Sequence, residues 1–276
     1  MALEAANKHK ISARRLSVIF STARRNFVKT GKNHLSNKRQ KNAKLAKKLI
    51  KQKALDNPDY GYRMITASLR LDGNIFNHKK VYRLYSELNL NLNLRRKKRR
   101  KIPARKKIYE IAQNQNEIWS LDFVHNSIKS KNVRTINIID EFNREILDIK
   151  ASKSLPSQKV IDVLEEIIKN QKRKPSAFRI DNGTEFTSEK FINWANENKI
   201  DLLYIQPGKP YQNCYIERFN GTYRNEVLNK YIFNSIEELQ QITDDWIFYY
   251  NNKRPHSSLN GLPPKSFAKI GGKSLS

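Results

Sequence analysis

Three acidic residues stand in sequence settings that predict a shared chemical role. Asp122 follows the apolar run Ile118–Leu121, Asp181 begins an Asp-Asn-Gly segment, and 35 residues separate Asp181 from Glu217. Mg²⁺ and Mn²⁺ are hard cations that prefer carboxylate oxygens. Two such ions about 3.5 to 4 Å apart activate a water or a 3′-hydroxyl and stabilise the leaving oxygen of a phosphodiester. On a strongly basic chain, these acids predict phosphoryl transfer on a nucleic acid.

The positive charge of the chain is concentrated at one end. The 276 residues have a formal net charge of +28, and residues 1–107 hold 31 lysines and arginines against five acids. The rest of the chain holds 23 basic and 21 acidic side chains. Phosphate neutralisation and counterion release favour such a composition, so we predict a polyanion-binding region joined to a nearly neutral domain.

Composition also bounds the compartment. Cys214 is the only cysteine, so an intramolecular disulfide and a cysteine-based zinc site are excluded, and a reducing, cytoplasmic compartment is expected. No run approaches about 18 consecutive apolar residues, and the early run Leu16–Phe20 is short and flanked by arginines. We therefore expect neither a signal sequence nor a membrane partner.

Residues 1–94 carry the patterns of a basic, all-α region. Helices are expected over Ser12–Val28, Ala43–Leu55, Tyr62–Leu71 and about His78–Leu88, with a glycine turn at residues 72–74. Two short helices around such a turn are typical of a helix-turn-helix. Its second helix would enter a major groove with Lys79, Lys80 and Arg83. A small helical bundle with a solvated basic face fits the spacing equally well.

Residues 95–110 are predicted to form a basic linker. Ten of the thirteen residues from 95 to 107 are lysine or arginine, and almost nothing there could be buried in a core. Phosphates would neutralise this charge, so we expect contact with the DNA backbone. The residues concerned are Arg95, Arg96, Lys97, Lys98, Arg99, Arg100 and Lys101. A solvated linker is the alternative.

Residues 111–276 are expected to form one catalytic domain. Strands are predicted at residues 118–123, 134–139, 146–149, 177–180 and 201–205, and helices at 156–170, at 188–198 and towards the end of the chain. Three consecutive strands followed by alternating strands and helices predict a mixed α/β sheet covered by helices.

The acids acquire positions in this framework. Asp122 would end the first strand, Asp181 would end the fourth, and Glu217 would lie on a helix that begins near Gln212. Asn213 and Arg224 lie four residues before and seven residues after Glu217, so both would share its helix face. From there Asn213 would orient the carboxylate or touch the substrate.

At these residues the chain resembles the insertion-sequence transposases of the two-reading-frame (IS-three) group, which have a retroviral-integrase-like core. The resemblance is carried by residues 119–122, 181–186, 211–222 and 249–256. Residues 60–63 and 77–84 resemble the helical domain that precedes that core. Gln212 departs from the pattern, because family members commonly have an acid there.

The resemblance implies an RNase H-like fold and a DDE site. In that site Asp122, Asp181 and Glu217 would bind two Mg²⁺ or Mn²⁺ ions, and Arg224 would contact DNA near the cut end. The implied activity is that of a polynucleotidyl transferase, which cleaves at a 3′ end of a bacterial element and transfers the freed 3′-hydroxyl to target DNA.

The resemblance also implies partners. They are element ends with inverted repeats, target DNA, further copies of this chain on DNA, and a first-frame helix-turn-helix protein or a fusion with it. The chain would then be a second-frame product that works at the bacterial nucleoid.

The sequence also bears on alternative functions and on several weaker candidate residues. A nuclease of the same fold that only hydrolyses DNA remains an alternative, whereas the intact acids disfavour an inactive DNA-binding regulator. A nucleotide-driven machine is disfavoured because the sequence has no Gly-x-x-x-x-Gly-Lys-[Ser/Thr] loop. His125 and Asp140 are expected to be structural. For Glu185, a position facing the substrate and one facing away fit the sequence equally well. The aromatic residues between 246 and 250 should pack on the core.

Overall fold

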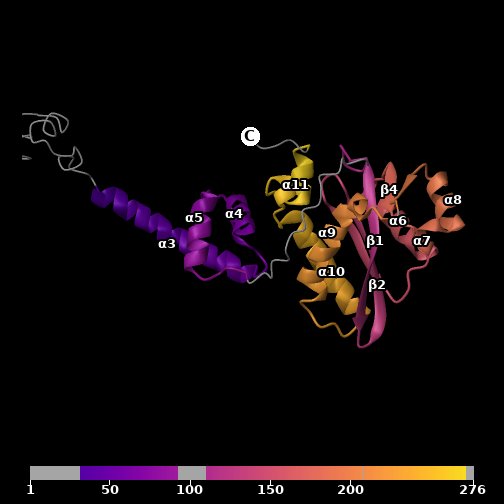
Figure 1. Ribbon diagram of the computed structural model, residues 1–276, viewed down its shortest axis with the longest axis horizontal. Coiled ribbons are helices and arrows are strands. Elements are labelled where there is room, and N and C mark those ends of the chain that lie inside the picture. Colours follow the sequence, from indigo (N-terminus) through magenta and orange to yellow (C-terminus); the bar gives the residue numbers. More distant parts are fainter. Residues whose placement is uncertain (1–31, 93–109, 207, 272–276) are drawn as a thin grey trace, which may run out of the picture.

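The computed structural model describes residues 32–92, 110–206 and 208–271, which form a helical region and a sheet-containing core (Figure 1). The expected helix over Ser12–Val28 lies outside the described residues, as do the boundary near residue 108 and most of the basic linker. Among the described helices, none is long and apolar enough to cross a membrane.

The helical region consists of α3 (Lys32–Asp56), α4 (Tyr62–Leu71) and α5 (His78–Glu87). The Asn77 side chain caps α5 by accepting a hydrogen bond from the Lys79 amide at 2.8 Å. The small core contains Ile50, Ile65, Leu69, Val81 and Leu84. The predictions for α4 and α5 are confirmed. The prediction for α3 was too short, because its first turns carry no apolar stripe and extend the helix 11 residues before Ala43.

A five-stranded mixed sheet, in the order β3-β2-β1-β4-β5, forms the centre of the core. β1 (Ile118–Ile128), β2 (Lys131–Asp140) and β3 (Ile146–Ser152) pair antiparallel. β4 (Ala177–Ile180) and β5 (Asp201–Tyr204) extend the sheet with parallel pairing. The predicted mixed α/β sheet is confirmed.

Helices pack against the sheet in two separate apolar clusters. One cluster joins the sheet to α6 (Ser157–Gln171), α7 (Thr184–Thr187) and α8 (Glu189–Glu197). The other joins it to α9 (Cys214–Tyr223), the π-helical turn η3 (Arg224–Leu228) and α10 (Ile236–Asn252). The short elements η2 (Pro210–Asn213), η4 (Ser257–Leu259) and α11 (Pro264–Lys269) complete the fold.

The prediction that Asp122 ends the first strand was wrong. β1 continues to Ile128, and Asp122 is paired with Asn137 in the middle of the hairpin. The strand continues because Val124 and Ile128 are buried on either side of a polar stretch. Lys129 and Ser130 then form a tight turn in which both residues have positive φ, at 48° and 63°.

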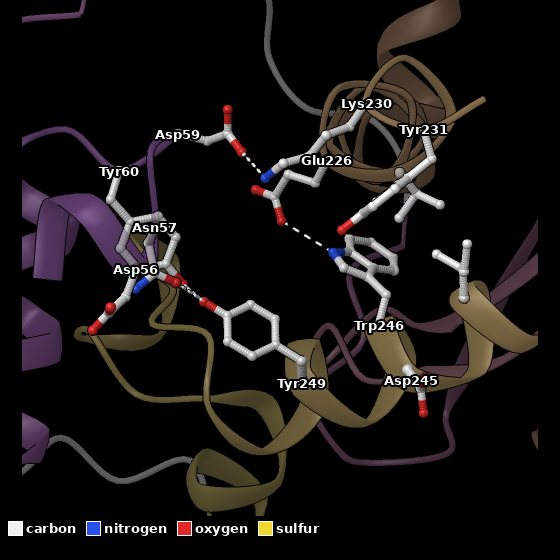
Figure 2. A pocket seen from close by; sticks show the side chains of 12 residues that line it. Asp56, Asn57, Asp59, Tyr60, Glu226, Lys230, Tyr231, Asp245, Trp246 and Tyr249 are labelled. Atoms are coloured by element: carbon white, nitrogen blue, oxygen red, sulfur yellow. Dashed lines mark hydrogen bonds and ion pairs between the residues drawn. The ribbon is translucent and has the colours of Figure 1, made fainter.

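The helical region contacts the core along α10 and η3 (Figure 2). The Tyr249 hydroxyl lies 2.5 Å from the Tyr60 hydroxyl and donates to Asn57 Oδ1 at 2.5 Å. Lys230 forms an ion pair with Asp59 at 3.0 Å. These contacts border a cavity of about 360 Å³, so polar bonds rather than continuous packing join the two parts here.

Candidate active site

Asp122 lies on the central strand of the sheet and is held by two hydrogen bonds. Its Oδ1 accepts from the backbone N–H of Phe123 at 2.8 Å, and its Oδ2 accepts from Asn220 Nδ2 at 2.7 Å. The first bond comes from β1 itself and the second from α9. The carboxylate is therefore oriented from two elements that are far apart in the sequence.

Asp181 follows β4 and lies beside Asp122. β1 and β4 are parallel with Ser120 opposite Arg179, and each acid comes two residues further along the chain than the residue of this pair on its side. Neighbouring strands run about 4.7 to 4.9 Å apart. Asp181 Oδ1 accepts from the Gly183 amide at 2.9 Å, so the same carboxylate also shapes the turn after β4.

Gly183 is packed directly against the Asp181 carboxylate. A β-carbon at this position would lie 2.9 Å from Asp181 Oδ1 and 3.4 Å from Glu185 Oε2. Its φ of −62° is open to any residue, so close approach rather than backbone conformation explains the glycine. Glu185 itself forms an ion pair with Arg134 at 2.6 Å.

Glu217 lies in the first turn of α9 and is exposed. Ile216 and Phe219, its neighbours on the helix, are buried in the cluster beneath and fix the face that Glu217 presents. The predicted helix is confirmed, although the 3₁₀ turn η2 precedes it and α9 begins at Cys214 rather than near Gln212.

The three acids interact electrostatically. The pKa of Asp122 is raised to about 6, mainly by burial and also by the negative charges of Asp181 and Glu217, while the hydrogen bonds from Phe123 and Asn220 oppose the rise. Like charges in one neighbourhood make ionisation of Asp122 harder, and a divalent cation among them would reverse that effect.

The acids share a neighbourhood without forming a closed cage. Among the described residues, no group of three or more histidine, cysteine or acidic side chains lies close enough together to hold a metal ion as it stands. The donor set of three carboxylates nevertheless fits a hard divalent cation in chemical type. Side-chain closure around the ion would then complete the site.

A buried hydrogen-bond relay, which the sequence analysis missed, supports Asp122. Thr135 Oγ1 donates to Asn137 Oδ1 at 2.9 Å, and Asn137 Nδ2 donates to Asn220 Oδ1 at 2.7 Å. Each amide that accepts through its oxygen can donate only through its nitrogen. The relay therefore sets the orientation in which Asn220 donates to Asp122. Its sequence signals are slight: Asn220 lies one helical turn after Glu217.

The two predicted neighbours of Glu217 have different environments. Arg224 is exposed, and its Nη1 donates to the backbone carbonyl of His125 at 3.2 Å. Asn213 is 4% exposed, and its Oδ1 has no hydrogen-bond partner among the described residues. Its burial leaves little surface for DNA, whereas Arg224 is accessible. Gln212 accepts from the Gln206 amide at 2.8 Å and so fastens the preceding loop.

The weaker candidates also take definite places. Asp140 is buried and accepts from the backbone amides of Asn116 and Phe142, which confirms a structural turn acid. Trp246 and Tyr250 are buried in the core as expected. The expectation was wrong for Phe248, which is 61% exposed because it lies on the outer face of α10.

The predicted DNA-binding residues are described only in part. Lys79 and Arg83 are exposed on α5. Lys80 is half-buried, with its ammonium 5.2 Å from the centroid of the Phe76 ring. The basic residues 95–101 lie outside the described part of the chain.

Comparison with protein families gives three matches. Two models described as an integrase core domain match residues 112–210 and 198–264, and one described as an HTH-like domain matches residues 40–99. Together with the strand order of the sheet, the two core matches confirm the predicted RNase H-like fold.

Several known proteins are similar to the chain. A protein of insertion element IS476 from Xanthomonas euvesicatoria is 38% identical over 76% of this chain, which spans 60% of that protein's length. A protein of insertion element IS407 from Burkholderia multivorans is 36% identical over 82% of this chain and 81% of its own. The putative transposase InsK of IS150 from Escherichia coli is 28% identical over 74% of this chain and 76% of its own length.

Among solved structures, the HTLV-2 integrase catalytic core domain in complex with magnesium is similar, with a TM-score of 0.47 and 21% identity. The similarity covers 55% of this chain and 96% of that chain.

Proposed function

The chain belongs to the insertion-sequence transposases of the IS-three group, with an integrase core domain behind an HTH-like region, and we propose that it performs DNA cleavage and strand transfer for its element. The reaction would begin with hydrolysis at a 3′ end of the element. The freed 3′-hydroxyl would then attack a phosphodiester of target DNA, without a covalent enzyme intermediate.

The observation that carries this proposal is the alignment of Asp122 and Asp181 on adjacent parallel strands, with α9, which bears Glu217, bonded to Asp122 through Asn220. Asp122 and Asp181 would contribute to both sites for Mg²⁺ or Mn²⁺, and Glu217 would complete one of them. Two bound ions would supply activation of the attacking oxygen and stabilisation of the leaving oxygen.

The other residues of the site would position these carboxylates and the DNA. Asn220 and the Phe123 amide hold both oxygens of Asp122, so its direction is set before an ion arrives. Gly183 leaves room for Asp181, whose carboxylate a larger residue would displace. Arg224, which begins η3 directly after the helix that carries Glu217, would hold the backbone of DNA near the cut end.

We further propose that DNA is retained by the basic regions outside the core. Lys79 and Arg83 on α5 would meet DNA first, and the linker of residues 95–110 would neutralise backbone phosphates. The division into residues 1–94, 95–110 and 111–276 belongs to this proposal. Joining two element ends requires more than one copy of the chain on DNA, with or without a first-frame partner.

The test is metal-dependent cleavage of DNA that carries the element's ends. The purified variants Asp122→Asn, Asp181→Asn and Glu217→Gln should lose cleavage and keep nearly all DNA binding. Glu189→Gln, which alters an exposed acid on α8, is the matched control and should cleave normally. Cleavage that persists in any of the three variants would overturn the assignment.

A second substrate separates a transposase from a nuclease. DNA with a pre-cut 3′ end needs no hydrolysis, so a transposase should join it to target DNA. An enzyme that cleaves uncut ends but never joins pre-cut ones is a nuclease of the same fold.

A further inference from the structure

A cleft of about 240 Å³ opens on the core beside α9. Its walls come from α9, from the turn between β2 and β3, and from the segment that follows α10. Six of the thirteen lining residues are arginine, serine or threonine: Arg144, Arg218, Arg254, Thr222, Ser257 and Ser258. Within the part of the chain that the structure describes, no aspartate or glutamate lines it. Such a lining favours an anion.

Arg144 is oriented by an aromatic ring and forms no ion pair with a described acid. It occupies the β2–β3 turn with a φ of 61°, and its guanidinium carbon lies 3.6 Å from the centroid of the Tyr215 ring. Stacking on an aromatic ring fixes the plane of a guanidinium and leaves its in-plane N–H groups directed outward. Neither Arg144 nor Arg218 forms an ion pair with another described residue. An oriented, unpaired guanidinium is suited to two-point binding of a phosphate.

The floor of the cleft is polar and incompletely bonded. Arg254 donates to both carboxylate oxygens of Glu226, which largely neutralises its charge and locks it in place. His256 is 7% exposed, and its Nε2 has no hydrogen-bond partner among the described residues.

The cleft is lined in part by α9, the helix that carries Glu217. Arg218 directly follows Glu217 on α9 and therefore projects about 100° around the helix from it. Tyr215, Phe219 and Thr222, which also line the cleft, lie about 140° to 160° around α9 from Glu217. DNA bound at the acids would therefore have to pass around α9 to reach the cleft. Met64 of α4 contributes to the rim, so the same DNA would pass the helical region.

We propose that this cleft binds a phosphodiester of the DNA backbone, through Arg144 and Arg218, away from the bond that reacts. The inference rests on the proposed function, because it adds a contact to the DNA on which the acids would act. The contact is made to phosphate and so carries no sequence preference.

The experiment measures binding of the full chain to a random-sequence duplex in EDTA over a range of salt concentrations. Arg144→Gln and Arg218→Gln remove the charges and keep most of the aliphatic packing. The double variant should reduce the slope of log affinity against log salt concentration by about 0.9, the value for one lost phosphate contact, and each single variant should reduce it by part of that amount. Lys190→Gln, an exposed cation on α8, is the matched control and should leave the slope unchanged.

Two outcomes would overturn the proposal. One is that both arginine variants, shown to be folded by thermal melting, keep the slope of the control. The other is that inorganic phosphate binds the unmodified chain and not the variants while DNA binding stays the same, which would make the cleft a site for small anions. Because binding is measured without metal ions, reduced slopes in the arginine variants together with no cleavage by the unmodified chain would count only against the proposed chemistry.

Discussion

Replacing Asn220 with alanine should shift the pH dependence of DNA cleavage. In the native chain, Asn220 Nδ2 donates to Asp122 Oδ2 at 2.7 Å and so stabilises the ionised carboxylate. Burial and the charges of two further acids already raise the pKa of Asp122 to about 6. Loss of the donor should raise it further, because nothing in the relay replaces that hydrogen bond.

The size of the effect follows from the energy of one charged hydrogen bond. Such a bond contributes about 1.5 kcal/mol at the low end of its range, which corresponds to about one pKa unit. The pKa of Asp122 would then move from about 6 to about 7. At pH 7 the ionised fraction would fall from about nine tenths to about one half, and at pH 6 from about one half to about one tenth.

The assay is the rate of cleavage at low Mg²⁺ concentration between pH 5.5 and pH 8.5, roughly the range that brackets both pKa values. The acid limb of the profile for Asn220→Ala should lie about one pH unit higher, with near-normal rates at the alkaline end. Asn225→Ala, in the exposed turn that follows α9, is the control. An unshifted acid limb in a folded Asn220→Ala protein would show that the relay does not tune Asp122. A cleavage rate of Asn220→Ala that is low at every pH would show that the substitution disturbs the structure of the site and does not act through the pKa of Asp122.

Three further predictions concern the site and its surroundings. Gly183→Ala should lower the cleavage rate at least about tenfold with little change in melting temperature, because the new β-carbon would lie 2.9 Å from Asp181 Oδ1; an unchanged rate would show that Asp181 tolerates displacement. In metal-free buffer at pH 7, Asp122→Asn should be more stable than the native chain by about 3 kcal/mol, the equivalent of the pKa shift of Asp122, and this gain disappears below about pH 4. The sign follows because a raised carboxyl pKa makes the folded chain lose stability as pH rises from 3.8 to about 6. Thermal melting across this range measures the difference, and a variant less stable than the native chain at pH 7 would contradict the prediction. Tyr249→Phe removes the hydroxyl bonded to Tyr60 and Asn57 and should destabilise the docked helical region by about 1 to 2 kcal/mol, measured by urea unfolding, with Phe248→Tyr as the control.

The elements that the sequence predicted well are those with an unambiguous apolar pattern. β4 was placed to the residue, because four consecutive residues are buried on both faces of the sheet and turn residues follow. α3 was predicted too short because its charged first turns have no apolar face. β1 was predicted too short because the polar residues after Val124 have little strand propensity of their own. They are held in the strand by their pairing with β2.

The sequence predicts the three acids as the site from residue type and spacing, whereas it does not predict the residues that support them. Asn137 reaches Asn220 only because the hairpin register sets Asn137 opposite Asp122 and α9 crosses that point of the sheet. A shift of one residue in the register would turn the Asn137 side chain to the other face. No pattern along the chain encodes such a contact, and the same holds for the approach of Gly183 to Asp181.

The position of Asp122 in the middle of a strand has a mechanical consequence. A carboxylate at a strand end would depend on a loop for its direction, whereas Asp122 is paired in β1 on one side and held by α9 on the other. Asp181 and Glu217 lie in a turn and in the first turn of a helix, where side chains adjust at lower cost. Asp122 would therefore keep its position when ions bind, and the side chains of Asp181 and Glu217 would move to complete the coordination of the divalent ions. On this basis, substitutions in the relay should alter the pH profile of cleavage, whereas substitutions around Asp181 should alter its maximal rate.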